Sequence, residues 1–280
     1  MIGPDDILVM NEQEKLELLS RLADGEGWSG TFEPVYLKLA EDESPKVRAA
    51  AIVALWDLAS PEHIDMLMSK AESDPDTTVR GKAASVLGVY IYEGDIEELD
   101  EARFLHVRRF LLDLAQDPDE ELLVRRMAIE ALSFGNDEEV HDLIAWAYEH
   151  PNTEMKLSAV FAMGRSGAPR WHQIILEELK SADRQIKLEA INAANESGLQ
   201  AATPALRNLV ASRDKDIAIA AIYALSHTRG PGALETLEMC ALAEDDEVRR
   251  SAEDALDEFL GTPPDPGDFG DFGDDLEEDD

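Results

Sequence analysis

The sequence predicts an all-α protein, an α-solenoid wound as a right-handed superhelix of about seven helical hairpins with an N-terminal capping helix. Three observations predict it: a recurring phrase, a helical spacing of apolar residues, and helix breakers between the helices. The phrase is a β-branched residue or Met, usually followed by a cation, with Ala four positions later. It starts at Val47, Val79, Val124, Met155, Ile186, Ile217 and Val248. Four of the six intervals are 31 residues, one is 32 and one is 45, so one insertion interrupts a regular array.

Each repeat reads as a helix, a polar corner and a second helix that carries the phrase. Counted from the start of the phrase, apolar residues fall at offsets 0, 4, 7 and 8, which is the 3.6-residue period of a helix. Corners such as Asp74-Pro75-Asp76 hold breakers and caps, and Gly167 and Gly198 follow second helices. The alanine at offset 4 should let the two helix axes approach to about 8 to 10 Å.

The two ends of such an array need caps, because a terminal hairpin has a neighbour on one side only. The last copy has Arg250 at offset 2, where most inner copies are apolar, and Asp257 at offset 9, where no inner copy is charged. At the front, Leu16, Ser20 and Ala23 fall one period before Val47, Ala51 and Ala54. Residues 11–23 are therefore expected to form half a repeat that caps the array.

This pattern divides the chain into three parts. Residues 1–31 are expected to form the cap helix and a loop, and residues 32–260 the solenoid, with an insertion near 89–110. Residues 261–280 contain nine acids, four glycines, three prolines and no cation, and we expect this tail to be disordered.

Across residues 32–260 the repeats resemble the HEAT-like repeats of the phycobilisome-lyase type, whose consensus runs close to D-x-x-V-R-x-x-A-x-x-A-L-G. The clearest copies are residues 76–88 and 152–164. The resemblance implies a solenoid of HEAT-like hairpins. It implies less about function, because members of the family include chromophore-lyase subunits, metal-dependent hydroxylases and plain interaction scaffolds.

Charge narrows the classes of partner. Sixty-one acidic and 25 basic residues give a formal net charge of −36, which repels phosphate backbones and anionic lipids. Neither a signal peptide nor a membrane-length apolar span is visible, so we expect a cytoplasmic protein that binds neither nucleic acid nor membrane. The single cysteine, Cys240, lies in an apolar run and is expected to be buried.

We expect no enzymatic activity, no metal and no cofactor. The hydroxylases of the similar family place His-Glu pairs on several repeats, whereas no histidine here is followed by Glu. His141 and His172 occupy equivalent positions in adjacent repeats. Stacked helices lie about 10 Å apart, too far for both rings to reach one Zn²⁺ at about 2.0 to 2.1 Å. No Ser-His-Asp order, glycine-rich phosphate loop or cysteine pair is evident.

Offsets 2, 6 and 9 of the second helices should point toward the concave face, where solenoids usually bind their partners. The aromatic residues among them suit a peptide or helix, and two asparagines could bond a peptide backbone. The alternative is that packing in the array covers these side chains. The predicted partner-binding residues are Trp56, Arg126, Leu157, Phe161, Leu188, Asn192, Asn195, Ile219 and Tyr223.

Two further segments have alternative interpretations. The insertion carries a cation cluster, Arg103, His106, Arg108 and Arg109, which could recruit an acidic partner or the chain's own tail. The favoured interpretation is salt bridges with the nearby Glu97, Glu98, Asp100 and Glu101. In the tail, Phe269, Phe272 and Leu276 could anchor a short acidic binding motif, or the tail could simply keep the chain soluble.

The sequence thus favours a non-catalytic scaffold or adaptor that binds a protein or peptide on the concave face, with acidic rims selecting a basic or neutral partner. One alternative is a lyase-like or chaperone-like subunit that presents a client or chromophore to chemistry done elsewhere. Another is a fixed structural subunit of a larger assembly.

Overall fold

The computed structural model describes residues 6–23 and 32–261. The predicted tail anchors Phe269, Phe272 and Leu276 lie outside these residues. The chain divides into two compact units, unit 1 through Trp171 and unit 2 from His172. In both units all regular elements in the described ranges are helical, which confirms the all-α hairpin prediction.

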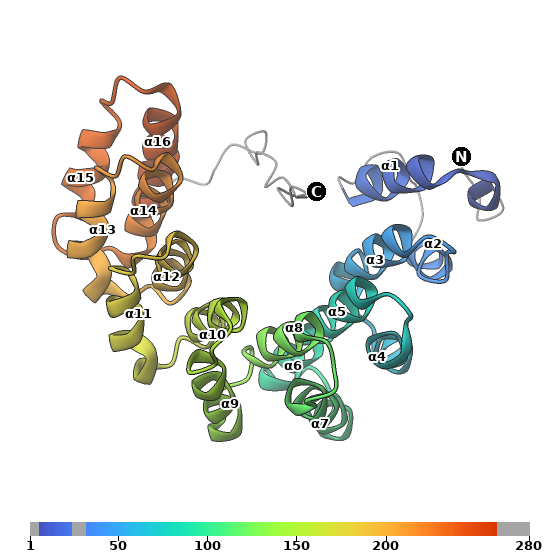
Figure 1. The fold of residues 1–280 in the computed structure, drawn as a ribbon. Coiled ribbons are helices and arrows are strands. Elements are labelled where there is room, and N and C mark those ends of the chain that lie inside the picture. Colours follow the sequence, from blue (N-terminus) through green and yellow to red (C-terminus); the bar gives the residue numbers. More distant parts are fainter. Residues whose placement is uncertain (1–5, 24–31, 262–280) are drawn as a thin grey trace. The chain divides into compact units, whose positions relative to one another are not determined.

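In its described residues, unit 1 contains four hairpins preceded by one α-helix. Each phrase lies on the second helix of a hairpin, and α6 is an additional helix between the second and third hairpins (Figure 1). The elements in order are η1 (Asp6–Val9), α1 (Glu12–Ala23), α2 (Glu33–Leu39), α3 (Pro45–Val53), η2 (Trp56–Leu58), η3 (Pro61–His63), α4 (Ile64–Ser73), α5 (Thr77–Val86), α6 (Gly88–Asp95), α7 (Glu101–Gln116), α8 (Leu122–Leu132), α9 (Glu138–Tyr148), α10 (Thr153–Ser166) and η4 (Pro169–Trp171).

Unit 2 contains three hairpins of the same kind. Its elements are α11 (His172–Glu178), α12 (Arg184–Glu196), η5 (Gln200–Ala202), α13 (Thr203–Leu209), α14 (Lys215–Thr228), α15 (Ala233–Cys240) and α16 (Asp246–Leu260). Within each unit consecutive second helices pack side by side, α3 on α5, α5 on α8 and α8 on α10 in unit 1, and α12 on α14 and α14 on α16 in unit 2 (Figure 1).

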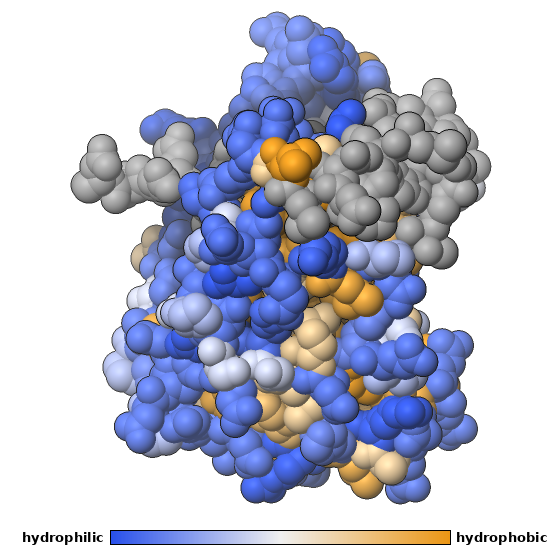
Figure 2. Space-filling model, turned by 90° about the vertical axis from the view of Figure 1, so that its right-hand side faces the viewer, coloured by the Kyte–Doolittle hydropathy of each residue, from blue (hydrophilic) through white to orange (hydrophobic). Residues whose placement is uncertain are grey.

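On the face drawn in Figure 2, hydrophilic side chains predominate and hydrophobic ones gather in a narrow band between them. Over the described ranges, no helix combines the length and the apolar character needed to span a membrane.

The phrase begins in the first turn of a helix, and a residue three positions before it caps that helix. Asp76, three residues before the phrase, accepts the backbone N–H of Val79 at 3.1 Å, which pairs one of the open donors of the helix end. Six of the seven second helices are capped in this way, whereas α8 begins after Glu121 without a side-chain cap. The capping residues are Ser44, Asp76, Asn152, Asp183, Asp214 and Asp245.

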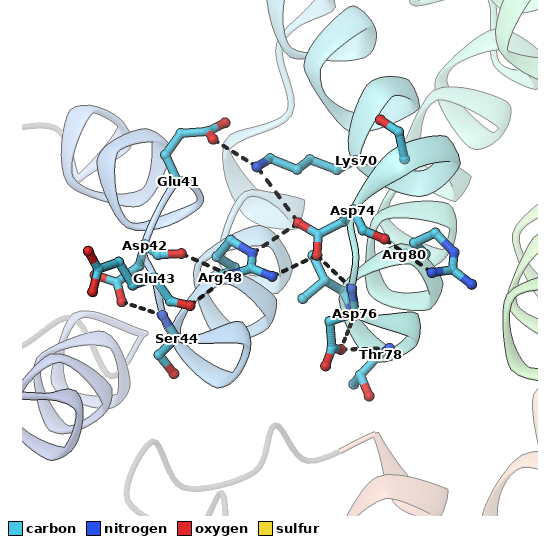
Figure 3. Close-up of polar contacts among 12 residues, drawn as sticks. Glu41, Asp42, Glu43, Ser44, Arg48, Lys70, Asp74, Asp76, Thr78 and Arg80 are labelled. Carbon is cyan, nitrogen blue, oxygen red and sulfur yellow. Dashed lines mark hydrogen bonds and ion pairs between the residues drawn. The ribbon is translucent and has the colours of Figure 1, made fainter.

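The cation of the phrase pairs the carbonyls of its own corner. Arg48 donates from Nη1 to the carbonyl oxygens of Asp42 and Glu43 at 2.9 and 3.1 Å, and Arg80 donates to that of Asp74 at 3.1 Å (Figure 3). Arg125 and Arg249 make the same kind of bond to Ala115 and Ala243. A cation at the carboxyl end of a helix also favours the helix dipole. The recurring Arg is therefore explained by the fold of the hairpin.

The alanine at offset 4 is fully buried in every copy, as predicted. Ala51, Ala83, Ala128, Ala159, Ala190, Ala221 and Ala252 all have 0% exposure. The methyl group lies inside the packed hairpins, so a larger side chain there would force neighbouring atoms apart.

Helix α1 packs on α3, so the prediction of a cap helix is confirmed, but the predicted register is wrong. Leu18, Leu19 and Leu22 are the buried residues, whereas Ser20 and Ala23 are exposed. In the described residues α1 is not the second helix of a hairpin, so it buries its own leucine stripe against α3 and does not follow the repeat register. Cys240 is also half-buried, not buried as predicted.

The insertion supplies α6 and the segment after it, and α7 is the first helix of the third hairpin. The prediction that the cation cluster forms salt bridges is confirmed for Arg103, Arg108 and Arg109. The predicted acidic partners were wrong for two of these three arginines. Arg103 pairs with Asp100 as expected. The other two pairings are Arg109 with Asp113, and Arg108 with Asp137 and Glu139 of the next hairpin.

Candidate functional site

Aromatic side chains of unit 1 form a contact series that we call the aromatic ladder: Trp56, Tyr92, Phe134 and Phe161, with Arg165. The Phe134 ring centre lies 5.7 Å from that of Trp56 and 6.0 Å from that of Tyr92. The guanidinium carbon of Arg165 lies 4.5 Å from the ring centres of both Phe134 and Phe161. These distances are those of aromatic pairing and cation–π contact.

A glycine at the start of α6 makes the ladder continuous, because it carries no side chain. A Cβ built on Gly88 would lie 3.1 Å from Cε2 of Phe134 and 3.1 Å from the Cα of Ala131. The ring of Phe134 therefore lies over the backbone of Gly88 and reaches Trp56, which belongs to the first hairpin. The additional helix α6 contributes Tyr92, whose side chain is 49% exposed.

A polar network lies beside the ladder on α8 and α10. Arg126 pairs with Glu154 at 2.7 Å and donates from Nε to the Ser158 hydroxyl at 2.9 Å. That hydroxyl donates in turn to Oε1 of Glu130. Burial raises the pKa of the Glu130 carboxyl, although the charges of Arg126, Arg165 and Lys82 act in the opposite direction.

On the second helices of unit 2 the corresponding surface is more polar. The Tyr223 hydroxyl lies 3.4 Å from Oδ2 of Asp254, and burial is the main reason why the pKa of Tyr223 is raised. One turn on, Ser226 donates to Glu258 at 2.7 Å, and the His227 ring lies 3.0 Å from the same carboxylate.

The structure leaves most of the predicted partner-binding residues between exposure and burial. In unit 1, Trp56 and Phe161 are half-buried members of the ladder, Arg126 is internally paired, and Leu157 is half-buried. In unit 2, Leu188, Asn195, Ile219 and Tyr223 are half-buried and Asn192 is exposed. The side-chain oxygen of Asn195 is buried and has no hydrogen-bond partner among the described residues.

Three ladder residues, Tyr92, Phe134 and Arg165, were missed by the sequence analysis. Phe134 and Arg165 stand at offset 10, one position beyond those considered, and Tyr92 lies outside the repeat. The available signal was the glycine at offset 9 of the second repeat, because a gap on a packed surface admits a large neighbour.

Among the side chains that the structure describes, no three His, Cys, Asp or Glu residues are placed to hold a metal ion. His141 bonds the side chain of Asn136 at 2.7 Å, lies 3.0 Å from Nη1 of Arg170, and packs edge-on against Trp171. This ring is thus part of a structural cluster.

Solved structures with this fold come from several systems. A chain of the complex of CpcE and CpcF of phycocyanin lyase from Nostoc sp. PCC7120 is 16% identical over 85% of this chain and 94% of that chain, with a TM-score of 0.56. A chain of the structure of Kap95p with RanGDP is 17% identical over 94% of this chain and 39% of that chain, with a TM-score of 0.53. At these identities the likeness shows the fold alone.

The curated proteins contain no significant match to this sequence. The family model for HEAT repeats matches residues 33–106 and 172–257, which together make up more than half of the chain. With the seven observed hairpins, this match shows that the chain belongs to the HEAT repeat family.

Proposed function

We propose that this HEAT-repeat protein is a non-catalytic scaffold that binds a polypeptide on the surfaces of its second helices, with the aromatic ladder of unit 1 as the main contact. Repeats of the phycobilisome-lyase type suit this role, and residues 76–88 and 152–164 follow that consensus closely. HEAT repeats typically mediate protein interactions, which supports the choice of partner class.

The single observation that carries the proposal is the continuity of the ladder. Its residues come from the first, third and fourth hairpins and from α6, so the rings form one surface that no single repeat could provide. Aromatic side chains dominate binding energy in many interfaces because they bury a large area with few rotatable bonds.

The ladder is also held in place before any partner arrives. The guanidinium of Arg165 lies against the rings of Phe134 and Phe161, and the ring of Phe134 packs on the backbone of Gly88. A partner that stacks on fixed rings loses less side-chain entropy on binding than one that must order them.

The test begins with affinity capture from a lysate of the source cell, followed by purification of the captured polypeptide. Its affinity is then measured for the intact chain, for Phe134→Ala/Phe161→Ala, and for Phe110→Ala. Phe110 is a matched control, since it is half-buried on the first helix α7 and takes no part in the ladder.

We expect the double variant to weaken binding by about 30-fold or more, as loss of a hot spot would, and Phe110→Ala to leave it within about twofold. If the double variant binds as tightly as the intact chain, the ladder is not the binding surface. A bilin-dependent absorbance change on mixing would instead favour the client-presenting alternative.

A further inference from the structure

A cavity opens in unit 1 away from the second-helix surface, between the corner that joins α7 to α8 and the helix α9. Its volume is about 680 Å³, within the range of about 300 to 1,000 Å³ typical of ligand sites. Pro118 and Arg125 line one side, and Asp142, Leu143 and Trp146 line the other.

Trp146 is 42% exposed, and the side chains of Arg125 and His150 lie against its indole. The guanidinium carbon of Arg125 lies 5.2 Å from the indole centre, and Nε of Arg125 donates to the carbonyl of Ala115 at 3.1 Å. The ring of His150 packs edge-on at 5.4 Å. A large apolar surface is thus held open toward solvent, although burying it would be favourable.

Acidic residues line the cavity and lie beside its lining in the sequence. Glu139 and Asp142 of α9 belong to the lining, and Pro118 of the lining belongs to the corner 117–121, whose other four residues are Asp or Glu. Two of these carboxylates have partners in other elements, since Glu120 pairs with Arg80 and Glu139 pairs with Arg108. Asp142 in the lining and the exposed corner residues Asp117, Asp119 and Glu121 next to Pro118 together outnumber the one cation of the lining, Arg125.

We propose that this cavity is a second docking site and that its occupant is a basic polypeptide segment. An apolar side chain of the segment packs against Trp146 and Leu143, and a Lys or Arg on either side of it pairs with Asp142 and Asp119. Acidic walls around a partly desolvated site attract cations and select against anions. Residues 262–280 of this chain carry no cation, so the chain's own tail does not match the site.

The site is independent of the proposed scaffold surface, because its apolar wall belongs to the first helix α9 and none of the ladder residues Trp56, Tyr92, Phe134, Phe161 and Arg165 lines the cavity. The two can therefore fail separately. A partner that used both would gain affinity by linking two weaker contacts.

Three fluorescein-labelled peptides test the site by fluorescence anisotropy with the full chain: Lys-Leu-Arg-Leu-Lys, Gln-Leu-Gln-Leu-Gln and Glu-Leu-Gln-Leu-Glu. The variants are Trp146→Ala and Asp142→Asn at the cavity and Phe134→Ala at the ladder. The controls are Asp257→Asn and Leu242→Ala, an exposed acid and an exposed leucine of unit 2. Circular dichroism melting checks that every variant is folded.

We expect the basic peptide to bind most tightly, and Trp146→Ala to weaken it by about tenfold or more. Asp142→Asn should weaken it by about threefold, and added salt should reduce this difference. Controls should stay within about twofold of the intact chain. Equal binding of the basic and acidic peptides, unchanged affinity in Trp146→Ala, or a loss caused by Phe134→Ala instead would each overturn the inference.

Discussion

Arg48 and Asp74 form a two-point ion pair between the first and second hairpins. Nε of Arg48 lies 2.9 Å from Oδ2 of Asp74, and Nη2 lies 2.7 Å from Oδ1 (Figure 3). The two side chains are 10% and 2% exposed. Asp74 also accepts the backbone N–H of Asp76, so the carboxylate joins the first turn of α3 to the corner that starts α5. The arginine that closes its own hairpin here also links that hairpin to the next.

Replacing Arg48 with Met should strongly destabilise unit 1, because it leaves the Asp74 carboxylate buried without its charge partner. We expect the free energy of unfolding in urea to fall by about 3 to 5 kcal/mol. The matched control is Arg184→Met, which breaks an exposed pair with Asp214 and should cost about 0 to 1 kcal/mol.

A second comparison separates the ion pair from simple packing. The double variant Arg48→Met/Asp74→Leu carries no unpaired charge and should regain most of the lost stability. If the double variant is as unstable as Arg48→Met, the lost stability comes from packing and not from the unpaired carboxylate.

Asp74 should also make the stability of the folded chain depend on pH in the acidic range. Burial acts to raise the pKa of Asp74, but its hydrogen bonds with Arg48 and with the Asp76 N–H outweigh that effect, and the pKa lies below its ordinary 3.8. Because the folded pKa is below the unfolded one, the stabilisation is complete above the ordinary pKa and disappears as pH falls through the folded value. The stability gap between the intact chain and Asp74→Asn should therefore narrow between pH 7 and pH 2 in thermal unfolding. A gap of constant size would contradict this account.

Glu130 should show the opposite dependence. Burial raises the pKa of its carboxyl in the folded state, so the protonated form is favoured by folding and stability decreases as pH rises from below the ordinary value of 4.5 through the raised value. Glu130→Gln keeps an oxygen that can accept from Ser158 and removes the buried charge. We expect this variant to be at least as stable as the intact chain at pH 7, and its advantage to vanish at pH 4, by urea unfolding. A loss of stability at pH 7 would show that the charge is favourable where it lies.

Local periodicity explains why the hairpins could be predicted and much of the site could not. The buried pair Met155 and Ala159 follows directly from the spacing of offsets 0 and 4 on one helix. The contact between Trp56 and Phe134 joins residues 78 positions apart and depends on how three elements stack. No local pattern contains that information.

The partners in the ion pairs were predicted wrongly for the same reason. Sequence proximity suggested that Arg108 would pair within its own segment, but it reaches Asp137 and Glu139, which are 29 and 31 residues ahead. That separation is one repeat, so the pairing is a contact between stacked hairpins. Helix α1 shows the converse, because its buried face follows its own leucines when no full repeat surrounds it.

The packing of Phe134 on the Gly88 backbone can be tested by substituting two glycines, Gly88 at the start of α6 and Gly81 inside α5. Gly88→Ala places a Cβ 3.1 Å from the Cα of Ala131, which cannot move without α8, and 3.1 Å from the ring of Phe134. We expect unfolding free energy to fall by about 1 to 3 kcal/mol. Because Phe134 is pushed off Trp56, near-ultraviolet circular dichroism from the aromatic cluster should change as well.

Gly81→Ala is the matched substitution, since Gly81 lies inside α5 and the nearest atoms to its added Cβ belong to the side chains of Leu123 and Met127, at 3.4 Å. Those side chains can adjust, and replacing a helical glycine with alanine gains about 0.5 to 1 kcal/mol. We therefore expect Gly81→Ala to be as stable as the intact chain or more so, with an unchanged aromatic spectrum. Equal losses in both variants would mean that the second hairpin rejects any added methyl group, and Gly88 would then have no special role in letting Phe134 reach Trp56.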